Sequence, residues 1–326
     1  MSSGFESDPI LVEVTRGDVV ESVHRGRVAV TGPDGELIAS IGEPFAPIYP
    51  RSSLKPLQAV GMLRAGLDLD GALLALASAS HSGEPFHLDG VREVLSRSDL
   101  DVDALQTPPD YPLDDEARTA WIASGRGKEP LAMNCSGKHA GMLRTAVLRG
   151  DDPTRYRDPG QPVQTAIVRT IDDLAGQQAQ NLTVDGCGAP LWSIELYGLA
   201  RAFGRIAQGA PGTEEGRVAE AIRAHPEFVS GTHRDEVELH RAVPGLIGKG
   251  GAEAVHAVGL PDGRGVALKI ADGGARGRAA LMAAVLNALG YDDPILTAHQ
   301  QLPTLGHGEP VGVIRPVADL AARLRG

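Results

Sequence analysis

The sequence predicts an α+β fold: a mainly antiparallel sheet formed by strands from both the N- and the C-terminal part of the chain, covered by helices. Two observations carry this prediction. The first fifty residues and residues 252–271 are rich in β-branched residues, whereas the stretch between them reads as a series of alanine- and leucine-rich helices. The chain has 326 residues and neither an internal repeat nor an obvious linker, so we expect a single catalytic domain, residues 1–326.

The strand predictions rest on short β-branched runs that turn residues separate. Strands are expected at residues 10–14, 19–31, 37–41, 252–258, 266–271 and 311–314. Gly32-Pro33-Asp34-Gly35 is typical of a hairpin turn, and Leu260-Pro261-Asp262-Gly263 is typical of another. The strands on either side of each turn are therefore expected to pair.

The helix predictions rest on apolar residues that recur at helical spacing. Helices are expected at residues 53–65, 70–79, 88–97, 115–123, 138–148, 160–175, 192–207, 214–224 and 276–289. Ser53 is a plausible N-cap of the first of them, and Pro56 is tolerated there because the N–H that it lacks has no helical partner. The loop at residues 101–114 contains three prolines and is expected to be the least regular segment.

Composition and charge exclude several classes of protein. The net charge of −11 offers no basic stripe for phosphates, so we expect no nucleic-acid partner. No apolar run approaches the length of about 18 residues that a membrane span needs, and the N-terminal residues do not resemble a signal peptide. Two cysteines do not make a disulfide scaffold. A cytoplasmic protein is therefore expected.

Lysine is rare in this chain, with five lysines against twenty-six arginines. Four of the five lie in distinctive motifs, at Lys55, Lys138, Lys249 and Lys269. A desolvated lysine can lose its proton and act as a base or a ligand, whereas arginine stays charged. These positions are therefore candidate functional residues, although some lysines can be ordinary surface charges. For Lys269, a strand lysine that faces solvent is the simpler expectation.

Ser52 and Lys55 lie three residues apart at a predicted helix start, so the lysine can reach the serine. A neutral Lys55 could take the proton of Ser52 and activate it as a nucleophile, and penicillin-recognising enzymes use the same spacing. The alternative is that Ser52 only caps a helix and Lys55 is solvated. Similarly, Ser80-His81-Ser82-Gly83 either aims side chains into a cleft or forms a helix-end loop with a structural histidine.

Cys135 and Cys187 are the only cysteines, and each lies beside glycines and other ligand-type residues. Three interpretations are open: a disulfide, two unrelated thiols, or a shared metal, for which zinc would accept two thiolates with nitrogen or water. Lys249 lies in a glycine-rich segment too. That segment is no Walker A loop, because glycine rather than serine or threonine follows the lysine.

In combination these segments resemble the rhizobial-type L-asparaginases, the asparaginase II family. The resemblance extends from about residue 10 to about residue 315. It is carried, in chain order, by Arg51-Ser52-Ser53-Leu54-Lys55-Pro56, Ala79-Ser80-His81-Ser82-Gly83-Glu84, Asn134-Cys135-Ser136-Gly137-Lys138-His139, Asp185-Gly186-Cys187-Gly188 and Gly248-Lys249-Gly250-Gly251. The Asn134 segment, continued to Leu143, is the most specific part.

The resemblance implies an activity and a fold. The activity is hydrolysis of the L-asparagine side-chain amide to L-aspartate and ammonia, and the fold is similar to serine β-lactamases and glutaminases. Two catalytic Ser–Lys pairs are carried over from the matching motifs, Ser52 with Lys55 and Ser80 with Lys249. The family also makes a homodimer plausible.

The resemblance further implies a Zn²⁺ ion surrounded by Cys135, Lys138 and Cys187, with His139 and Asp185 lining the pocket. The charged α-groups of the substrate need partners of opposite charge. We expect Asp185 to meet the α-amino group and Arg51 to meet the α-carboxylate.

Two other functional interpretations stay open. One is another β-lactamase-like serine amidohydrolase, such as a glutaminase or a peptidase. The other is a catalytically silent protein that binds zinc or an amino acid. Ammonia release from asparagine and glutamine, together with hydrolysis of a chromogenic β-lactam, separates these interpretations.

Overall fold

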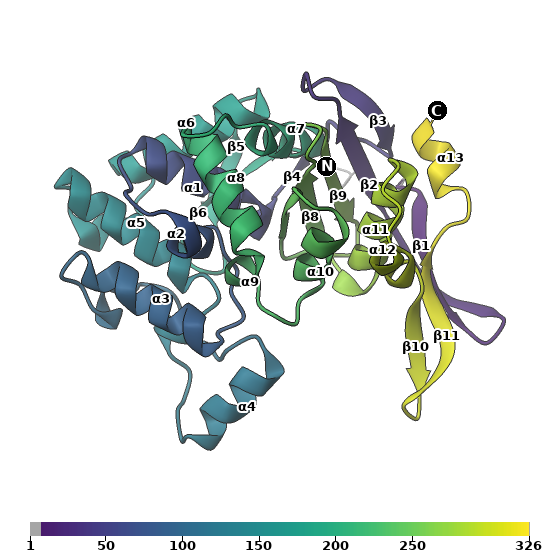
Figure 1. Ribbon diagram of the computed structural model, residues 1–326, viewed down its shortest axis with the longest axis horizontal. Coiled ribbons are helices and arrows are strands. Elements are labelled where there is room, and N and C mark those ends of the chain that lie inside the picture. Colours follow the sequence, from purple (N-terminus) through teal and green to yellow (C-terminus); the bar gives the residue numbers. More distant parts are fainter. Residues whose placement is uncertain (1–7, 326) are drawn as a thin grey trace. The chain divides into compact units, whose positions relative to one another are not determined.

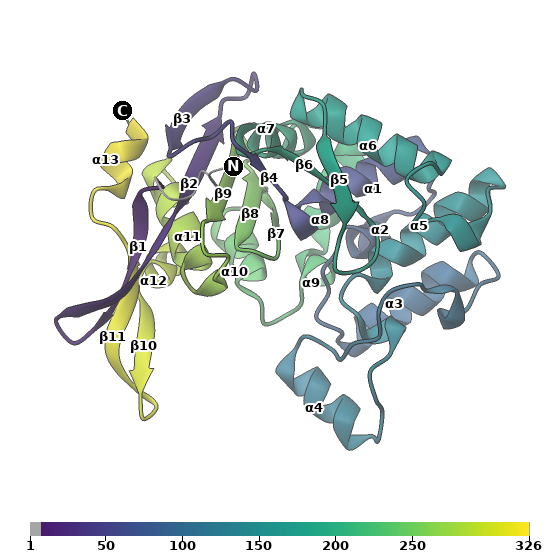
Figure 2. The same cartoon turned by 180° about the vertical axis from the view of Figure 1, so that it is seen from behind.

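The computed structural model describes residues 8–325, and the chain divides into two compact units. Unit 1 consists of Met1–Ser53, Ile194–Arg205 and Glu238–Gly326, and unit 2 of Leu54–Ser193 and Ile206–Val237. Figure 1 shows the course of the chain, and Figure 2 shows it from behind. The expectation of one catalytic domain over residues 1–326 stays a prediction.

Unit 1 is built on an eight-stranded sheet with the order β10-β11-β1-β2-β9-β8-β7, in which β3 also pairs with β2. All of its strand pairs are antiparallel. The strands are β1 (Ile10–Arg16), β2 (Val19–Thr31), β3 (Leu37–Ile41), β7 (Ile247–Gly250), β8 (Val255–Gly259), β9 (Gly265–Ile270), β10 (Leu302–Gly306) and β11 (Glu309–Pro316). N-terminal strands pair with C-terminal ones, β1 with β11 and β2 with β9, which confirms the predicted fold class.

Helices of unit 1 enclose an apolar core against this sheet. They include α11 (Arg278–Ala288), α12 (Pro294–His299) and α13 (Leu320–Arg325), seen beside the strands in Figure 1. Leu281 and Val285 of α11 join Val28 and Leu268 of the sheet in one buried cluster. Burial of such side chains is the main favourable contribution to the stability of a fold.

In three elements the chain passes from one unit to the other. These are α7 (Leu196–Ala207), α10 (Asp235–Ala242) and β6 (Pro190–Glu195). In unit 1, β4 (Pro47–Ile48) pairs with the last two residues of β6. In unit 2, β5 (Gln180–Val184) pairs with the earlier part of β6.

Unit 2 is mainly helical. Its α-helices are α1 (Lys55–Arg64), α2 (Gly71–Ala77), α3 (Pro85–Ser96), α4 (Asp115–Ala123), α5 (Ser136–Arg149), α6 (Pro162–Ala175), α8 (Glu214–Ala224) and α9 (Pro226–Val229). Short 3-10 turns lie at η2 (Val102–Ala104), η3 (Pro130–Ala132) and η4 (Pro153–Arg155). The loop around residues 101–114 contains only η2 and an isolated bridge from Asp110 to Glu129, in agreement with its predicted irregularity.

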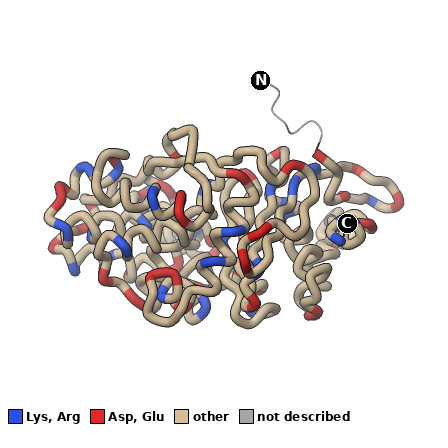
Figure 3. The backbone as a smooth tube through the Cα atoms, turned by 90° about the horizontal axis from the view of Figure 1, so that it is seen from above, with Lys and Arg blue, Asp and Glu red and all other residues tan. Residues whose placement is uncertain are grey.

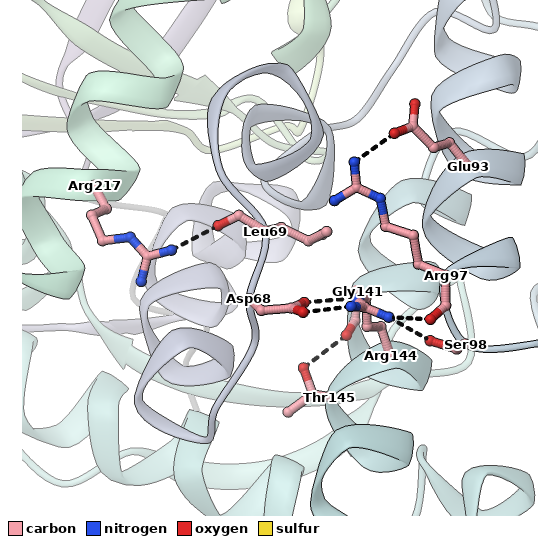
Figure 4. A network of polar contacts seen from close by, with 9 residues as sticks. All are labelled: Asp68, Leu69, Glu93, Arg97, Ser98, Gly141, Arg144, Thr145 and Arg217. Atoms are coloured by element: carbon pink, nitrogen blue, oxygen red, sulfur yellow. Dashed lines mark hydrogen bonds and ion pairs between the residues drawn. The ribbon is translucent and has the colours of Figure 1, made fainter.

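A buried arginine fixes the position of α5 within unit 2 (Figure 4). The Arg144 guanidinium donates to both carboxylate oxygens of Asp68, which lies between α1 and α2. It also donates to the Arg97 carbonyl at 2.6 Å and to Ser98 Oγ at 3.2 Å, at the end of α3. The five N–H groups of arginine allow one side chain to join three segments in this way.

Most predicted elements are confirmed, and three differences have physical causes. Residues 192–195, expected to be helical, belong to β6, which runs directly into α7 without a breaker between them. Ser53 does not cap α1, because its hydroxyl donates to the Lys249 carbonyl in unit 1. Lys269 does not face solvent: it lies in β9, only 7% exposed, and burial lowers its pKa.

Figure 3 shows acidic and basic residues interspersed along the backbone. Within residues 8–325, none of the helices combines the length and the apolar composition that crossing a bilayer requires. The absence of a nucleic-acid partner stays a prediction.

Candidate active site

Lys55 is the centre of a buried polar cluster in unit 2. It begins α1, is 1% exposed, and its Nζ donates to the Ala79 carbonyl, to Ser80 Oγ at 2.8 Å and to Cys135 Sγ at 3.0 Å. Three contacts satisfy the hydrogen-bonding capacity of Nζ, either as an ammonium group that donates to all three or as an amine that accepts from the Ser80 hydroxyl. The alternative of a solvated Lys55 is therefore excluded.

The segment after α2 carries Ser80 to this lysine. Ser80 donates its main-chain N–H to the Val229 carbonyl at 3.0 Å, and His81 donates its N–H to the Asn134 carbonyl at 3.0 Å. His81 Nε2 lies 2.8 Å from Ser136 Oγ, and burial lowers the pKa of His81 well below its ordinary value. His81 is thus a neutral histidine that fastens the Ser80 segment to the start of α5.

The two cysteines are free and buried, so the structure contains no disulfide between them. They pack together with Met133 and Ala189. A hydrogen bond from Cys187, together with the charges of Lys55 and Lys138, lowers the pKa of Cys135 well below its ordinary value, whereas the contact with Cys135 raises the pKa of Cys187.

The first turn of α5 presents Lys138 beside the sulfurs. Its Nζ lies 3.1 Å from Cys187 Sγ. Burial alone would lower the pKa of Lys138, but the charges of Cys187, Cys135 and Asp185 raise it above its ordinary value. The turn fits here because a Cβ at Gly137 would lie 2.6 Å from the Leu76 carbonyl of α2, so only glycine allows this approach.

His139 and Asp185 both lie beside Cys187. Burial lowers the pKa of His139 to about 4, and its Nδ1 lies 2.7 Å from the Tyr156 hydroxyl. Burial also raises the pKa of Tyr156 to about 12, so this hydroxyl stays protonated. Asp185 Oδ2 lies 3.8 Å from Cys187 Sγ in a turn that the Gly188 N–H closes on the Asp185 carbonyl.

The remaining predicted residues lie in unit 1. Arg51 and Ser52 belong to η1 (Arg51–Leu54), and Lys249 lies buried in β7. Ser53 Oγ donates to the Lys249 carbonyl at 3.0 Å, so η1 packs directly on β7. Arg51 has φ +54°, a left-handed conformation that non-glycine residues adopt rarely and often at functional sites.

The structure thus brings together seven of the ten predicted site residues in unit 2: Lys55, Ser80, Cys135, Lys138, His139, Asp185 and Cys187. The predicted pairs Ser52–Lys55 and Ser80–Lys249 each join the two units and stay predictions. The direct contact of Lys55 with Ser80 was not among the predicted pairs.

A structural zinc ion usually has four ligands drawn from Cys, His, Asp and Glu side chains. Within residues 8–325 there is no group of three or more His, Cys, Asp or Glu side chains arranged to hold a metal ion. Cys135 and Cys187 provide two sulfurs, but Lys138 would first have to lose a proton that their charge stabilises. Once Lys138 has lost that proton, the set Cys135, Lys138 and Cys187 would offer zinc two sulfurs and one nitrogen. Zinc binding stays a prediction.

Sequence reasoning missed Tyr156 and Gln106, which support His139. The Gln106 N–H donates to the Tyr156 hydroxyl at 3.0 Å. Both residues lie in irregular segments without a motif. No signal in the sequence points to them, because their role depends on contacts between segments far apart in the chain.

Comparison with known proteins identifies the family. The sequence profile described as L-asparaginase II matches residues 12–316. The chain belongs to the L-asparaginase II family. This membership supports an amidohydrolase, and it confirms the resemblance that the motifs indicate. No curated protein matches this sequence.

Several solved structures align with this chain, all at low sequence identity and with TM-scores below 0.5. A β-lactamase from Mycobacterium bovis aligns with TM-score 0.44 and 14% identity, over 80% of this chain and 94% of its own. The protein Mglu in its native form aligns with TM-score 0.46 and 14% identity, over 88% and 69%. The probable glutaminase YbaS aligns with TM-score 0.40 and 14% identity, over 82% and 86%. The family assignment rests on the sequence match.

Proposed function

We propose that the protein is an L-asparaginase, which hydrolyses the side-chain amide of L-asparagine to L-aspartate and ammonia. The observation that carries this proposal is the buried contact between Lys55 and Ser80 in a member of the L-asparaginase II family. Family membership supports the class of reaction. The contact supports proton transfer between a lysine and a serine.

Ser52 is the proposed nucleophile and Lys55 its base, because they lie three residues apart at the start of a helix. Lys55 in its amine form takes the Ser52 proton while Ser52 Oγ attacks the amide carbon. The tetrahedral intermediate then collapses, its C–N bond breaks, and an ester of Ser52 remains. Main-chain N–H groups near this helix start are candidates for stabilising the oxyanion.

The departing nitrogen needs a proton, and Ser80 is the proposed donor. Lys55 passes its new proton to Ser80 Oγ across the 2.8 Å contact, and the Ser80 hydroxyl hydrogen goes to the amide nitrogen. Ammonia therefore leaves neutral. Water then attacks the ester with the same groups acting in reverse, which releases L-aspartate and restores Ser52. Acid–base assistance of this kind contributes about 10²- to 10⁴-fold in rate.

Charged side chains are proposed to hold the two ends of the substrate. Asp185 meets the α-amino group and Arg51 the α-carboxylate, while His139 lines the pocket. Lys249 is the proposed second partner of Ser80. These roles come from the motifs, and the position of Asp185 beside Cys187 and Lys138 supports its part.

Zinc held by Cys135, Lys138 and Cys187 is part of the expectation from the family, and no step above uses it. Elemental analysis of the purified protein tests it. A homodimer and a cytoplasmic location likewise stay predictions, which size measurement and cell fractionation test.

Ammonia release with asparagine and glutamine, beside hydrolysis of a chromogenic β-lactam, tests the proposed activity. Asparagine is expected to be the preferred substrate. Preference for glutamine or for the β-lactam would favour another serine amidohydrolase. Binding of asparagine without turnover would favour an amino-acid-binding protein.

A further inference from the structure

A buried chain of hydrogen bonds ends on His139. The Gln106 main-chain N–H donates to the Tyr156 hydroxyl at 3.0 Å, and this hydroxyl lies 2.7 Å from His139 Nδ1. Both rings are fully buried, and they meet edge to face with centroids 5.4 Å apart. Solvent water therefore cannot replace either hydrogen bond.

The number of hydrogens available in this series of hydrogen bonds determines which tautomer the His139 imidazole adopts. The Gln106 N–H can only donate, and the tyrosine oxygen has one hydrogen of its own. If Nδ1 of His139 carried a hydrogen, the Tyr156 oxygen would accept twice and its own hydrogen would lack an acceptor. Within residues 8–325, the hydroxyl has no third hydrogen-bond partner. An unsatisfied buried donor is costly, so the hydroxyl donates to Nδ1.

We propose that Tyr156 is a positioning residue: it fixes His139 in the tautomer with hydrogen on Nε2 and so aims a donor at the substrate beside Cys187. Two observations support the direction of this donor. His139 Nε2 is fully buried, and within the described part of the chain it makes no hydrogen bond of ordinary length and angle. The neighbour of this ring is Cys187, and a hydrogen bond between the two side chains acts to raise the pKa of His139 against the effect of burial. Sulfur is a weak acceptor, so this N–H keeps the capacity to donate to an oxygen of the bound substrate.

The segment that carries Tyr156 is held firmly. Gln106 Nε2 donates to the Thr154 carbonyl at 2.7 Å, and Gln106 Oε1 accepts from Arg157 Nε at 2.7 Å. Arg157 in turn donates to the Gly188 carbonyl at 3.4 Å, next to Cys187. Residues before and after Tyr156 are thus tied to one glutamine and to the turn that carries Cys187. This keeps the distance between the hydroxyl and the imidazole fixed.

The catalytic consequence rests on the proposed asparaginase activity, but the tautomer does not. Nitrogen-15 NMR of histidine-labelled protein distinguishes a ring nitrogen that carries hydrogen from one that accepts a hydrogen bond. The His139 signals are identified as those that disappear in His139→Gln. In the wild-type protein we expect hydrogen on Nε2 and an accepting Nδ1. Hydrogen on Nδ1 would overturn the proposal, whether or not the protein hydrolyses asparagine.

Tyr156→Phe keeps the ring and removes the hydroxyl. We expect its His139 to become a mixture of tautomers and its kcat/KM for asparagine to fall about tenfold, mainly through KM. Tyr197→Phe is the matched control, because it removes a hydroxyl that donates to the Gly35 carbonyl at 2.9 Å in unit 1. Its tautomer and kinetics should match the wild type. An unchanged His139 tautomer in Tyr156→Phe would refute the role of Tyr156.

Discussion

Replacing Ser80 by alanine tests the proposed proton path. The substitution removes the hydroxyl that lies 2.8 Å from Lys55 Nζ and leaves the lysine two acceptors, the Ala79 carbonyl and Cys135 Sγ. Without this hydroxyl the departing nitrogen has no proton donor. We expect kcat to fall about 10²- to 10³-fold, within the range for acid–base assistance and equivalent to about 3–4 kcal/mol of barrier.

The cost to stability should be much smaller than the cost to catalysis. A hydrogen bond to a charged group is worth about 1.5–3 kcal/mol, and the two remaining acceptors offset part of the loss. We therefore expect the free energy of unfolding to fall by about 1–2 kcal/mol. Denaturant unfolding of the purified variant measures this quantity and shows whether the variant is folded under the assay conditions.

Steady-state ammonia release from asparagine measures the effect on kcat. Ser78→Ala is the control, because Ser78 is also buried at the end of α2 but donates only to the Leu74 carbonyl of its own helix, at 3.2 Å. The control should keep kcat within about twofold, since this local bond takes no part in the reaction. A folded Ser80→Ala protein with kcat within threefold of the wild type would refute the proton path.

Three further predictions concern stability, the metal and the substrate. Arg144→Met should lower the free energy of unfolding by about 2 kcal/mol in denaturant unfolding, because it leaves the Arg97 carbonyl and Asp68 without their partner. The Arg144 guanidinium lowers the pKa of Asp68 in the folded protein. The pair therefore stabilises the fold fully at pH values above the ordinary carboxyl pKa of about 4. This stabilisation is lost as the pH falls through the lowered pKa of the folded state. Unfolding of Arg144→Met should accordingly depend less on pH below about pH 4. Metal analysis is expected to find zinc bound to the wild-type protein and lost from Cys187→Ser; less than about a tenth of an equivalent in the wild type removes the site as proposed. Asp185→Asn should raise KM for asparagine about tenfold or more with a smaller change in kcat, and an unchanged KM excludes it from the substrate site.

Most of the sheet could be predicted because its strands are β-branched runs that clear turn residues separate, in the N-terminal and C-terminal parts of the chain. Gly35, with φ +83°, closes the predicted turn between β2 and β3. The prediction failed where a strand passes directly into a helix. Residues 192–195 of β6 run without a breaker into α7, so they read as the start of that helix.

The site could be predicted as a set of residues but not as a set of partners. Motifs identified Lys55, Ser80 and Cys135, yet spacing along the chain describes only neighbours within a helical turn. It paired Lys55 with Ser52, which stays a prediction, and it gave no indication that Lys55 contacts Ser80, 25 positions away. Tyr156 lies outside every motif. Its role depends on a fold that brings it to His139, and residue types alone carry no signal of that contact.

The central claim is that this chain hydrolyses asparagine through Ser52. Ammonia release and L-aspartate formation from L-asparagine, measured side by side for the wild-type protein and Ser52→Ala, test it most directly. The account predicts equal amounts of both products from the wild type and a loss of at least about 10³-fold in kcat for the folded variant, because no other group forms the ester. An active Ser52→Ala protein, or a wild-type protein that leaves asparagine intact, would contradict it.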